Sequence, residues 1–152
     1  MRGIGHPALK LKPHSTEWDL RDKGLTSGAC GWIAAAISKS TSLQKVILVG
    51  NKIGNTGAAA LAGAISKSTS LREVFLTSSS IGDTGAAALA GAISKSTSLQ
   101  KVYLTRNNIG APGKAALAKV ERSGLDLEYE TTFAGKVISP RSRPYDASRG
   151  RR

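Results

Sequence analysis

Hydrophobic and polar positions follow two different periods within one short stretch of the chain. Val46 and Leu48 lie two positions apart, which is the spacing that places side chains on one side of a β-strand. The apolar positions in residues 60–65 recur instead at helical spacing. Gly54 and Gly57 lie between the two patterns and indicate a turn. The pattern therefore predicts a strand, a turn and a helix in succession.

The ends of the predicted helix carry polar residues. Asn55 or Thr56 would cap its N-terminus, because short polar side chains accept hydrogen bonds from the first free amides of a helix. The segment Ser-Lys-Ser-Thr-Ser at residues 66–70 would end it, since these residues are poor helix formers. Phosphorylation of these hydroxyls is possible chemistry, but the polarity of a helix exit already explains them.

The strand–turn–helix pattern repeats every 28 residues. Residues 57–71, GAAALAGAISKSTSL, recur without change at residues 85–99. A weaker copy upstream places Trp18 at the position of Val46. Internal repeats of this length are typical of solenoids, in which stacked units bury a core that one unit could not bury alone. We predict four units and a partial fifth strand, at residues 15–42, 43–70, 71–98, 99–126 and Leu125–Tyr129.

The strand and turn of each unit carry a family resemblance. The string L-x-x-V-x-L-x-x-N-x-I-G, at Leu43–Gly54 and Leu99–Gly110, resembles the leucine-rich repeat. The full helix and the 28-residue length resemble the ribonuclease-inhibitor-like class, which includes the repeat regions of NOD-like receptors and Ran GTPase-activating proteins. The resemblance covers residues 15–130. It implies an α/β solenoid: a short right-handed arc with a concave parallel sheet and convex helices.

Two units depart from the asparagine that the family uses to satisfy backbone in the turn. Asn51 and Asn107 match that position, whereas the third unit has Ser79 and the first has Lys23. We therefore expect an irregular third turn. We interpret the first unit as a degenerate end cap, as terminal repeats often are.

One column of strand residues should face outward and form a candidate binding surface. Ile47 lies between the two inward residues of its strand, so its side chain must point to the concave face. Phe75 and Tyr103 occupy the same position in the next units, and together they would form a stripe about 10 Å long. Exposed apolar patches and aromatic anchors are typical of interfaces, although strand propensity alone would also place these residues there. The expected flanks are Lys45, Glu73 and Lys101 on one side, and Val49, Thr77 and Thr105 on the other.

The positive charge of the chain is concentrated at its ends. The net charge is +12, of which residues 1–14 contribute +3 and residues 133–152 contribute +5. The segment Ser139–Arg152 has almost no aliphatic residues and should not fold alone. It is either an arm for RNA, DNA or an acidic protein surface, or a solubilising tail. The tail residues concerned are Arg141, Arg143, Arg149, Arg151 and Arg152.

The sequence offers little for catalysis or metal binding. Cys30 is the only cysteine, which excludes an internal disulfide and any zinc site with several thiolates. It aligns with Ala58 and Ala86, so we predict a buried, inert thiol. Residues 110–114 resemble a phosphate loop only faintly and align with the turn of the preceding unit. No apolar run approaches the ~20 residues that span a bilayer.

These observations predict a basic N-terminal segment (1–14), a leucine-rich-repeat domain (15–130) and a basic C-terminal tail (131–152). We predict a non-enzymatic protein–protein interaction module, an adaptor or accessory subunit of a larger assembly, without cofactor or small-molecule substrate. We expect an intracellular, cytoplasmic location, with the nucleus or an organelle as alternatives. The alternative function is a basic accessory protein of a ribonucleoprotein that docks through its termini. No residue matches a catalytic motif, so the resemblance to Ran GTPase-activating proteins transfers no activity.

Overall fold

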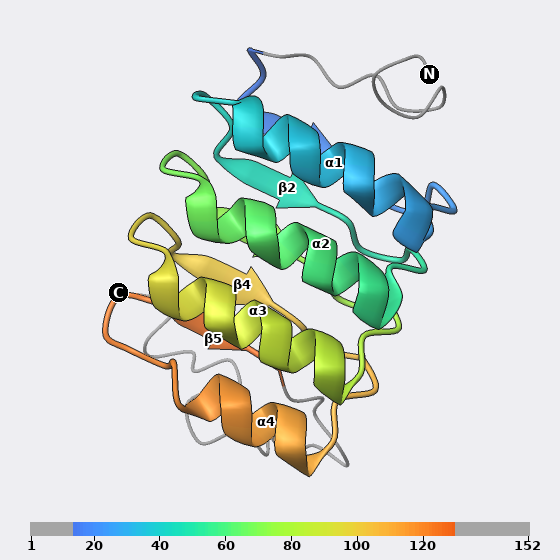
Figure 1. Ribbon diagram of the computed structural model, residues 1–152, viewed down its shortest axis with the longest axis vertical. Coiled ribbons are helices and arrows are strands. Elements are labelled where there is room, and N and C mark those ends of the chain that lie inside the picture. The colour runs from blue at the N-terminus through green and yellow to red at the C-terminus, as the bar shows by residue number, and fades with distance from the viewer. Residues whose placement is uncertain (1–13, 130–152) are drawn as a thin grey trace, which may run out of the picture.

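The computed structural model describes residues 14–129, which form one parallel sheet covered on one face by helices (Figure 1). The five strands lie side by side in chain order, and one helix connects each strand to the next. The elements are β1 (Glu17–Asp19), α1 (Ser27–Lys39), β2 (Lys45–Ile47), α2 (Gly54–Lys67), β3 (Glu73–Phe75), α3 (Asp83–Lys95), β4 (Lys101–Tyr103), α4 (Ala111–Ala118) and β5 (Asp126–Glu128).

The strands pair in the register that the repeat predicted, up to the last one. Trp18 pairs with Val46, which confirms the weaker first copy. From β1 to β4 each step is 28 residues, but Tyr103 pairs with Glu128, a step of 25. The fourth unit is therefore shorter than the predicted 99–126, and α4 has 8 residues where α3 has 13.

The core lies between the sheet and the helices. The inward strand residues Leu48, Leu76 and Leu104 are completely buried. Leu61 and Leu89 approach them from the helix layer and are 1% exposed. The predicted inward column is thus confirmed.

Close helix approach depends on a glycine near the start of α2, α3 and α4. A Cβ on Gly85 would lie 2.8 Å from Ile81 Cγ2 and 3.0 Å from Ala58 Cβ of the preceding helix. Gly57 and Gly113 are equally crowded. In contrast, a Cβ on Gly91 in the middle of α3 would meet nothing within 4 Å. Only the first set of glycines is therefore required by packing.

The turn asparagine satisfies the backbone of two adjacent units. Asn51 Oδ1 accepts hydrogen bonds from the amides of Lys23 (3.1 Å) and Leu25 (2.9 Å). Its Nδ2 donates to the carbonyls of Leu20 (2.8 Å) and Leu48 (3.0 Å). Asn107 bonds the third unit in the same way. A single side chain thereby replaces the hydrogen bonds with water that the backbone of the turn gives up when it is buried.

The third turn is irregular, as expected from its serine. Ser79 Oγ donates weakly to the carbonyls of Leu48 and Thr77, at 3.3 Å each. Within residues 14–129 no side chain accepts from the amides of Asn51 and Ile53, which are the counterparts of those bound by Asn107. The next residue, Ser80, adopts a positive φ of 59°. Without the asparagine, the chain follows a different path through the turn.

The capping prediction was wrong about which helix is capped. The structure gives α2 no side-chain cap. Asn55 Oδ1 instead accepts from the amides of Gly82 and Gly85, both at 2.8 Å, at the start of the next helix. Asp83 does the same for Gly110 (2.6 Å) and Gly113 (3.0 Å). The glycines bring neighbouring helices so close that a side chain in one first turn reaches the amides of the next.

The repeated Ser-Lys-Ser-Thr-Ser segment also bonds one unit to another. Ser68 Oγ accepts from the amide of Leu71 (3.0 Å) and closes the exit from α2. Ser70 Oγ donates to the carbonyl of Leu43 in the preceding turn (2.8 Å). Ser96 and Ser98 repeat these contacts one unit later. These contacts give the serines a structural role at the helix exit, as their polarity predicted.

Candidate functional site: the concave face of the sheet

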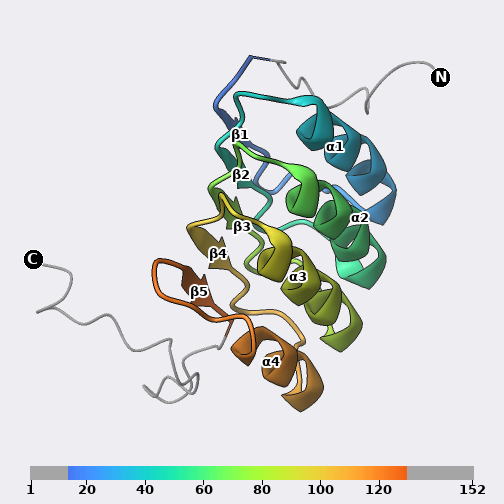
Figure 2. The ribbon, with the colours of Figure 1, turned by 60° about the vertical axis from the view of Figure 1, so that its left-hand side comes forward.

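Figure 2 shows the helices on one face of the sheet, and the opposite face is here called the concave face. The outward residues of the five strands line it. Two rows run across the strands. The first row, here called the charged row, contains Glu17, Lys45, Glu73, Lys101 and Asp126; the second contains Asp19, Ile47, Phe75, Tyr103 and Glu128. All six residues predicted for partner binding therefore lie on this face.

The three central residues of the second row form a continuous stripe, as the alternation predicted. Ile47, Phe75 and Tyr103 are half-buried and sit on adjacent strands in direct register. The rings of Phe75 and Tyr103 have centroids 5.2 Å apart and are tilted by 37°. This is within the range of favourable aromatic pairs. The two rings therefore support each other and form a fixed surface.

Lysines from the charged row lean over the aromatic rings. Lys45 Nζ lies 5.8 Å from the centroid of Phe75 and 3.5 Å from Glu73 Oε1. Lys101 Nζ lies 5.7 Å from the centroid of Tyr103. Both distances are within the reach of cation–π attraction. The aliphatic stems of the lysines thus extend the apolar stripe, while the ammonium group of Lys45 compensates Glu73.

Carboxylates gather around the hydroxyl of Tyr103. This hydroxyl donates a hydrogen bond of 3.0 Å to Asp126 Oδ2. The pKa of Tyr103 is raised above its ordinary value, first by burial, then by the bond to Asp126 and by the charges of Asp126, Glu128 and Glu73. All of these effects favour the neutral phenol, so Tyr103 presents an uncharged ring beside three acidic groups.

The sequence analysis did not identify Asp126 and Glu128 as part of the site. A uniform 28-residue period would place residue 131 beside Tyr103, whereas the shorter fourth unit brings Glu128 there. The available signal was the alternation of Asp126, Leu127 and Glu128 around an inward leucine. This alternation predicted a strand. Which residues of β4 would lie beside it depended on the length of the fourth unit.

The opposite end of the second row is also acidic. Asp19 Oδ2 forms an ion pair of 2.6 Å with Arg21 Nη2, and both side chains are exposed. The hydrogen bond from Arg21 is the main reason that the pKa of Asp19 is lowered. Asp19 therefore remains charged, but an arginine already compensates it.

The concave face is acidic although the protein is basic. The two rows contain five carboxylates and two lysines. Residues 14–129 as a whole contain eight acidic and thirteen basic side chains. Most of the described acids are thus on this one face, and most of the described bases lie elsewhere. A partner that approaches the sheet meets the opposite sign of charge from the one that the net charge of +12 implies.

The remaining candidates for chemistry have structural roles in the described region. Cys30 is completely buried, and burial raises the pKa of its thiol to about 11. The reactive thiolate is therefore scarce at neutral pH. Among residues 14–129 no three His, Cys, Asp or Glu side chains are placed to hold a metal ion. In the loop of residues 110–114, which faintly resembled a phosphate loop, the amides of Gly110 and Gly113 donate hydrogen bonds to the carboxylate of Asp83.

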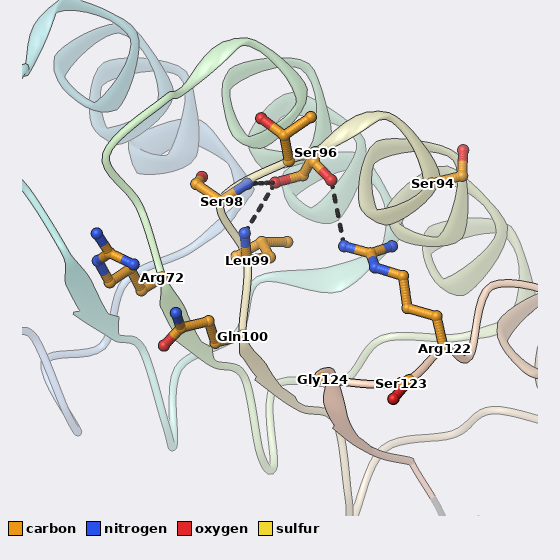
Figure 3. Close-up of a pocket in the computed structure, with 10 residues that line it drawn as sticks. Arg72, Ser94, Ser96, Ser98, Leu99, Gln100, Arg122, Ser123 and Gly124 are labelled. Atoms are coloured by element: carbon orange, nitrogen blue, oxygen red, sulfur yellow. Dashed lines mark hydrogen bonds between the residues drawn. The ribbon is translucent and has the colours of Figure 1, made fainter.

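A polar pocket of about 520 Å³ lies where α3 ends (Figure 3). Arg122 points toward the helix end and donates to the carbonyls of Ile93 (3.0 Å) and Ser96 (3.1 Å). It thereby binds carbonyls at a helix C-terminus, where a cation is favourable and an anion is not. Its guanidinium is used for structure, so the pocket does not make a specific anion site. The lining is Arg72, Ser94, Ser96, Thr97, Ser98, Leu99, Gln100, Arg122, Ser123 and Gly124.

The predicted basic termini lie outside the described residues. This applies to residues 1–13 and 130–152, and so to the tail arginines Arg141, Arg143, Arg149, Arg151 and Arg152. In the part of the chain that is described, no helix combines the length and the apolar character needed to cross a bilayer.

The comparisons with known proteins agree with this geometry. The family described as "Leucine Rich repeat" matches residues 39–62, 67–90 and 95–118, one match in each of three successive units. A similar solved structure is the actin-binding site 2 of leiomodin-1, with a TM-score of 0.69 and 21% sequence identity over 81% of this chain and 75% of that one. That likeness shows the fold. No curated protein sequence matches the chain. With its repeats in register, its parallel sheet and its shared turn asparagines, the chain belongs to the leucine-rich repeat family.

Proposed function

We propose that this domain is a non-enzymatic protein-interaction module, an adaptor or accessory subunit that holds a partner on its concave face. The observation that carries the proposal is the stripe of Ile47, Phe75 and Tyr103, aligned on a face that no described element covers. Exposed apolar stripes of this kind are favourable docking sites. We include a cytoplasmic location in the proposal, because the single Cys30 suits a reducing compartment.

The stripe is suited to binding because it is rigid before a partner arrives. Its side chains project from a sheet whose inward residues are fully buried, and Phe75 and Tyr103 contact each other. Little conformational entropy remains to be lost when the rings are covered, and preorganised aromatic side chains are frequent binding hot spots. The similar structure from leiomodin-1 is an actin-binding site by its title. It supports a binding role for this architecture and names no partner for this chain.

The proposal is tested by removing the two rings together. Affinity purification with the full chain would identify the partner, and titration would compare the wild type with the Phe75→Ala, Tyr103→Ala double variant. We expect binding to weaken by about tenfold or more, since an aromatic hot spot contributes more than about 1.4 kcal/mol. Trp32→Ala is the matched control, because Trp32 is a large exposed aromatic on α1, away from this face. Equal binding by the double variant would refute the proposal.

The second candidate is a basic accessory role in a ribonucleoprotein. The observation that favours it is the charge of +3 in residues 1–14 and +5 in residues 133–152. The acidic concave face would repel phosphates, so a polyanion would have to bind elsewhere. Replacing the five tail arginines with glutamine should then lower the salt slope of RNA binding by about one for each lost phosphate contact. An unchanged slope would identify the tail as passive.

A further inference from the structure

We propose that the partner presents a basic side chain about 10 Å from an apolar one, and that the concave face selects this combination. The inference rests on the proposed function and specifies the chemistry of the partner. The apolar side chain would cover Ile47 and Phe75. The arginine or lysine would lie beside the ring of Tyr103 and meet the carboxylates of Asp126 and Glu128.

The apolar half of the site has no charge of its own. Ile47 and Phe75 are neighbours in register on β2 and β3, and both are half-buried. Lys45 lies over Phe75 but is compensated by Glu73 at 3.5 Å. A partner side chain on these two residues therefore removes apolar surface from water without separating an ion from its counterion.

The basic half is defined by the charges around Tyr103. Glu73, Asp126 and Glu128 all act on its hydroxyl, and Asp126 also accepts its hydrogen bond. Lys101 Nζ lies 5.7 Å from the centroid of this ring. Because Glu73 is paired with Lys45, the acids that define this corner are Asp126, which accepts the hydroxyl's hydrogen bond, and Glu128, which lies in register beside Tyr103. An aromatic ring beside carboxylates suits a guanidinium, which can stack on the ring and pair with the acids.

The spacing follows from the sheet. Phe75 and Glu128 are in one row but two strands apart, from β3 across β4 to β5. Neighbouring strands are about 4.8 Å apart, so the two contact points are about 10 Å apart. In an extended partner segment this distance corresponds to about three residues, at about 3.3 Å each.

The charge of the face also argues against other occupants. The two rows contain five carboxylates and only two lysines, and this excess of negative charge disfavours a nucleic-acid backbone or an acidic peptide. A purely apolar segment would gain from the stripe and lose the attraction at the Tyr103 corner. A segment with both an apolar and a basic side chain would bind the stripe and also be attracted by the acids at the Tyr103 corner.

A random twelve-residue peptide library selected against the full chain tests the inference, with the Phe75→Ala variant as counter-selection. We expect the selected peptides to combine arginine or lysine with an aliphatic or aromatic residue about three positions away. Glu128→Lys should weaken the best peptide by about tenfold at physiological salt. Glu17→Lys is the matched control: it makes the same charge change on the same face but on β1, so screening over a Debye length of about 8 Å should leave the effect small.

The outcomes separate this inference from the proposed function. Peptides that depend on Phe75 but show no basic preference, or that respond equally to the two reversals, overturn the inference and leave the interaction module standing. If no selected peptide depends on Phe75, the concave docking surface fails as well. A self-association that Phe75→Ala abolishes would identify a second copy as the occupant and overturn the inference. Peptide binding that appears only after the five tail arginines are changed to glutamine would mean that the chain's own tail occupies the concave face. That result would also overturn the inference.

Discussion

The helix layer and the concave face of the two middle repeats follow opposite rules. Residues 57–71 recur without change at residues 85–99, so α2 and α3 share the same sequence from their first-turn glycine onward. On the concave face the equivalent positions of β2 and β3 differ: Ile47 is replaced by Phe75, and the positive Lys45 is replaced by the negative Glu73. The two layers belong to the same units, yet one is uniform and the other varies.

Packing explains why the two layers differ. The identical segments of α2 and α3 pack against each other, and a Cβ on Gly85 would already be too close to Ala58 of the preceding helix. A change there must be matched by its neighbours. Outward strand residues contact only the adjacent strands in the described region, so their identity is not fixed by the core. The comparison teaches that the fold tolerates variation on the face where a partner would be recognised.

The sharpest way to break the comparison is to truncate adjacent residues of one unit. Leu76→Ala should lower the free energy of unfolding by about 2–5 kcal/mol, because it leaves a cavity in a completely buried position. Phe75→Ala, one residue earlier on the outward side, should cost about 1 kcal/mol or less. Urea unfolding of both variants decides the matter. Similar losses would contradict the assignment of inward and outward columns.

The turns offer a comparison between an asparagine and a serine. Asn51→Ser should lower the free energy of unfolding by about 2–4 kcal/mol, since it removes four hydrogen bonds to buried backbone. Ser79→Asn is the reverse change and should raise the free energy of unfolding by about 1 kcal/mol, because the new side-chain oxygen can accept hydrogen bonds from the backbone amides of Asn51 and Ile53. Thermal unfolding would measure both. A destabilising Ser79→Asn would mean that the third turn cannot adopt the regular path.

Two glycines of α3 should respond to alanine with opposite signs. Gly85→Ala should destabilise by about 1–3 kcal/mol, because its Cβ would lie 2.8 Å from both Asn55 Oδ1 and Ile81 Cγ2. Gly91→Ala should stabilise by about 0.5–1 kcal/mol, since the position is open and alanine favours the helix. Denaturant midpoints of the two variants provide the measurement. Effects of the same sign would show that close helix approach does not limit this layer.

The smallest expected effect concerns Cys30, which stands where the next two units have alanine. Burial raises the thiol pKa from 9.0 to about 11 in the folded chain. The unfolded chain therefore loses this proton first, and the free energy of unfolding should fall as the pH rises from about 9 to 11. Cys30→Ala should be close to neutral at pH 7 and should lack this part of the decline. Parallel slopes for the two proteins between pH 8 and pH 11 would contradict a buried thiol.

The features that could be predicted from the sequence are those that the 28-residue repeat determines. Trp18 in the first core row, the inward leucines and the stripe from Ile47 to Tyr103 all followed from spacing. Each depends only on strand alternation and on a constant offset between units. The irregular third turn also followed from one residue, Ser79, because the role of the missing asparagine is local.

Contacts between units that depend on distance were decided only by the tertiary structure. The sequence placed Asn55 at the start of its own helix, but the spacing of the helices turned its side chain to the next one. The short fourth unit brought Asp126 and Glu128 to Tyr103, which made the end of the stripe acidic. A period fixes which side chains face the same way. How near they come depends on the packing of whole units, because backbone approach and helix length are set by all of their neighbours together.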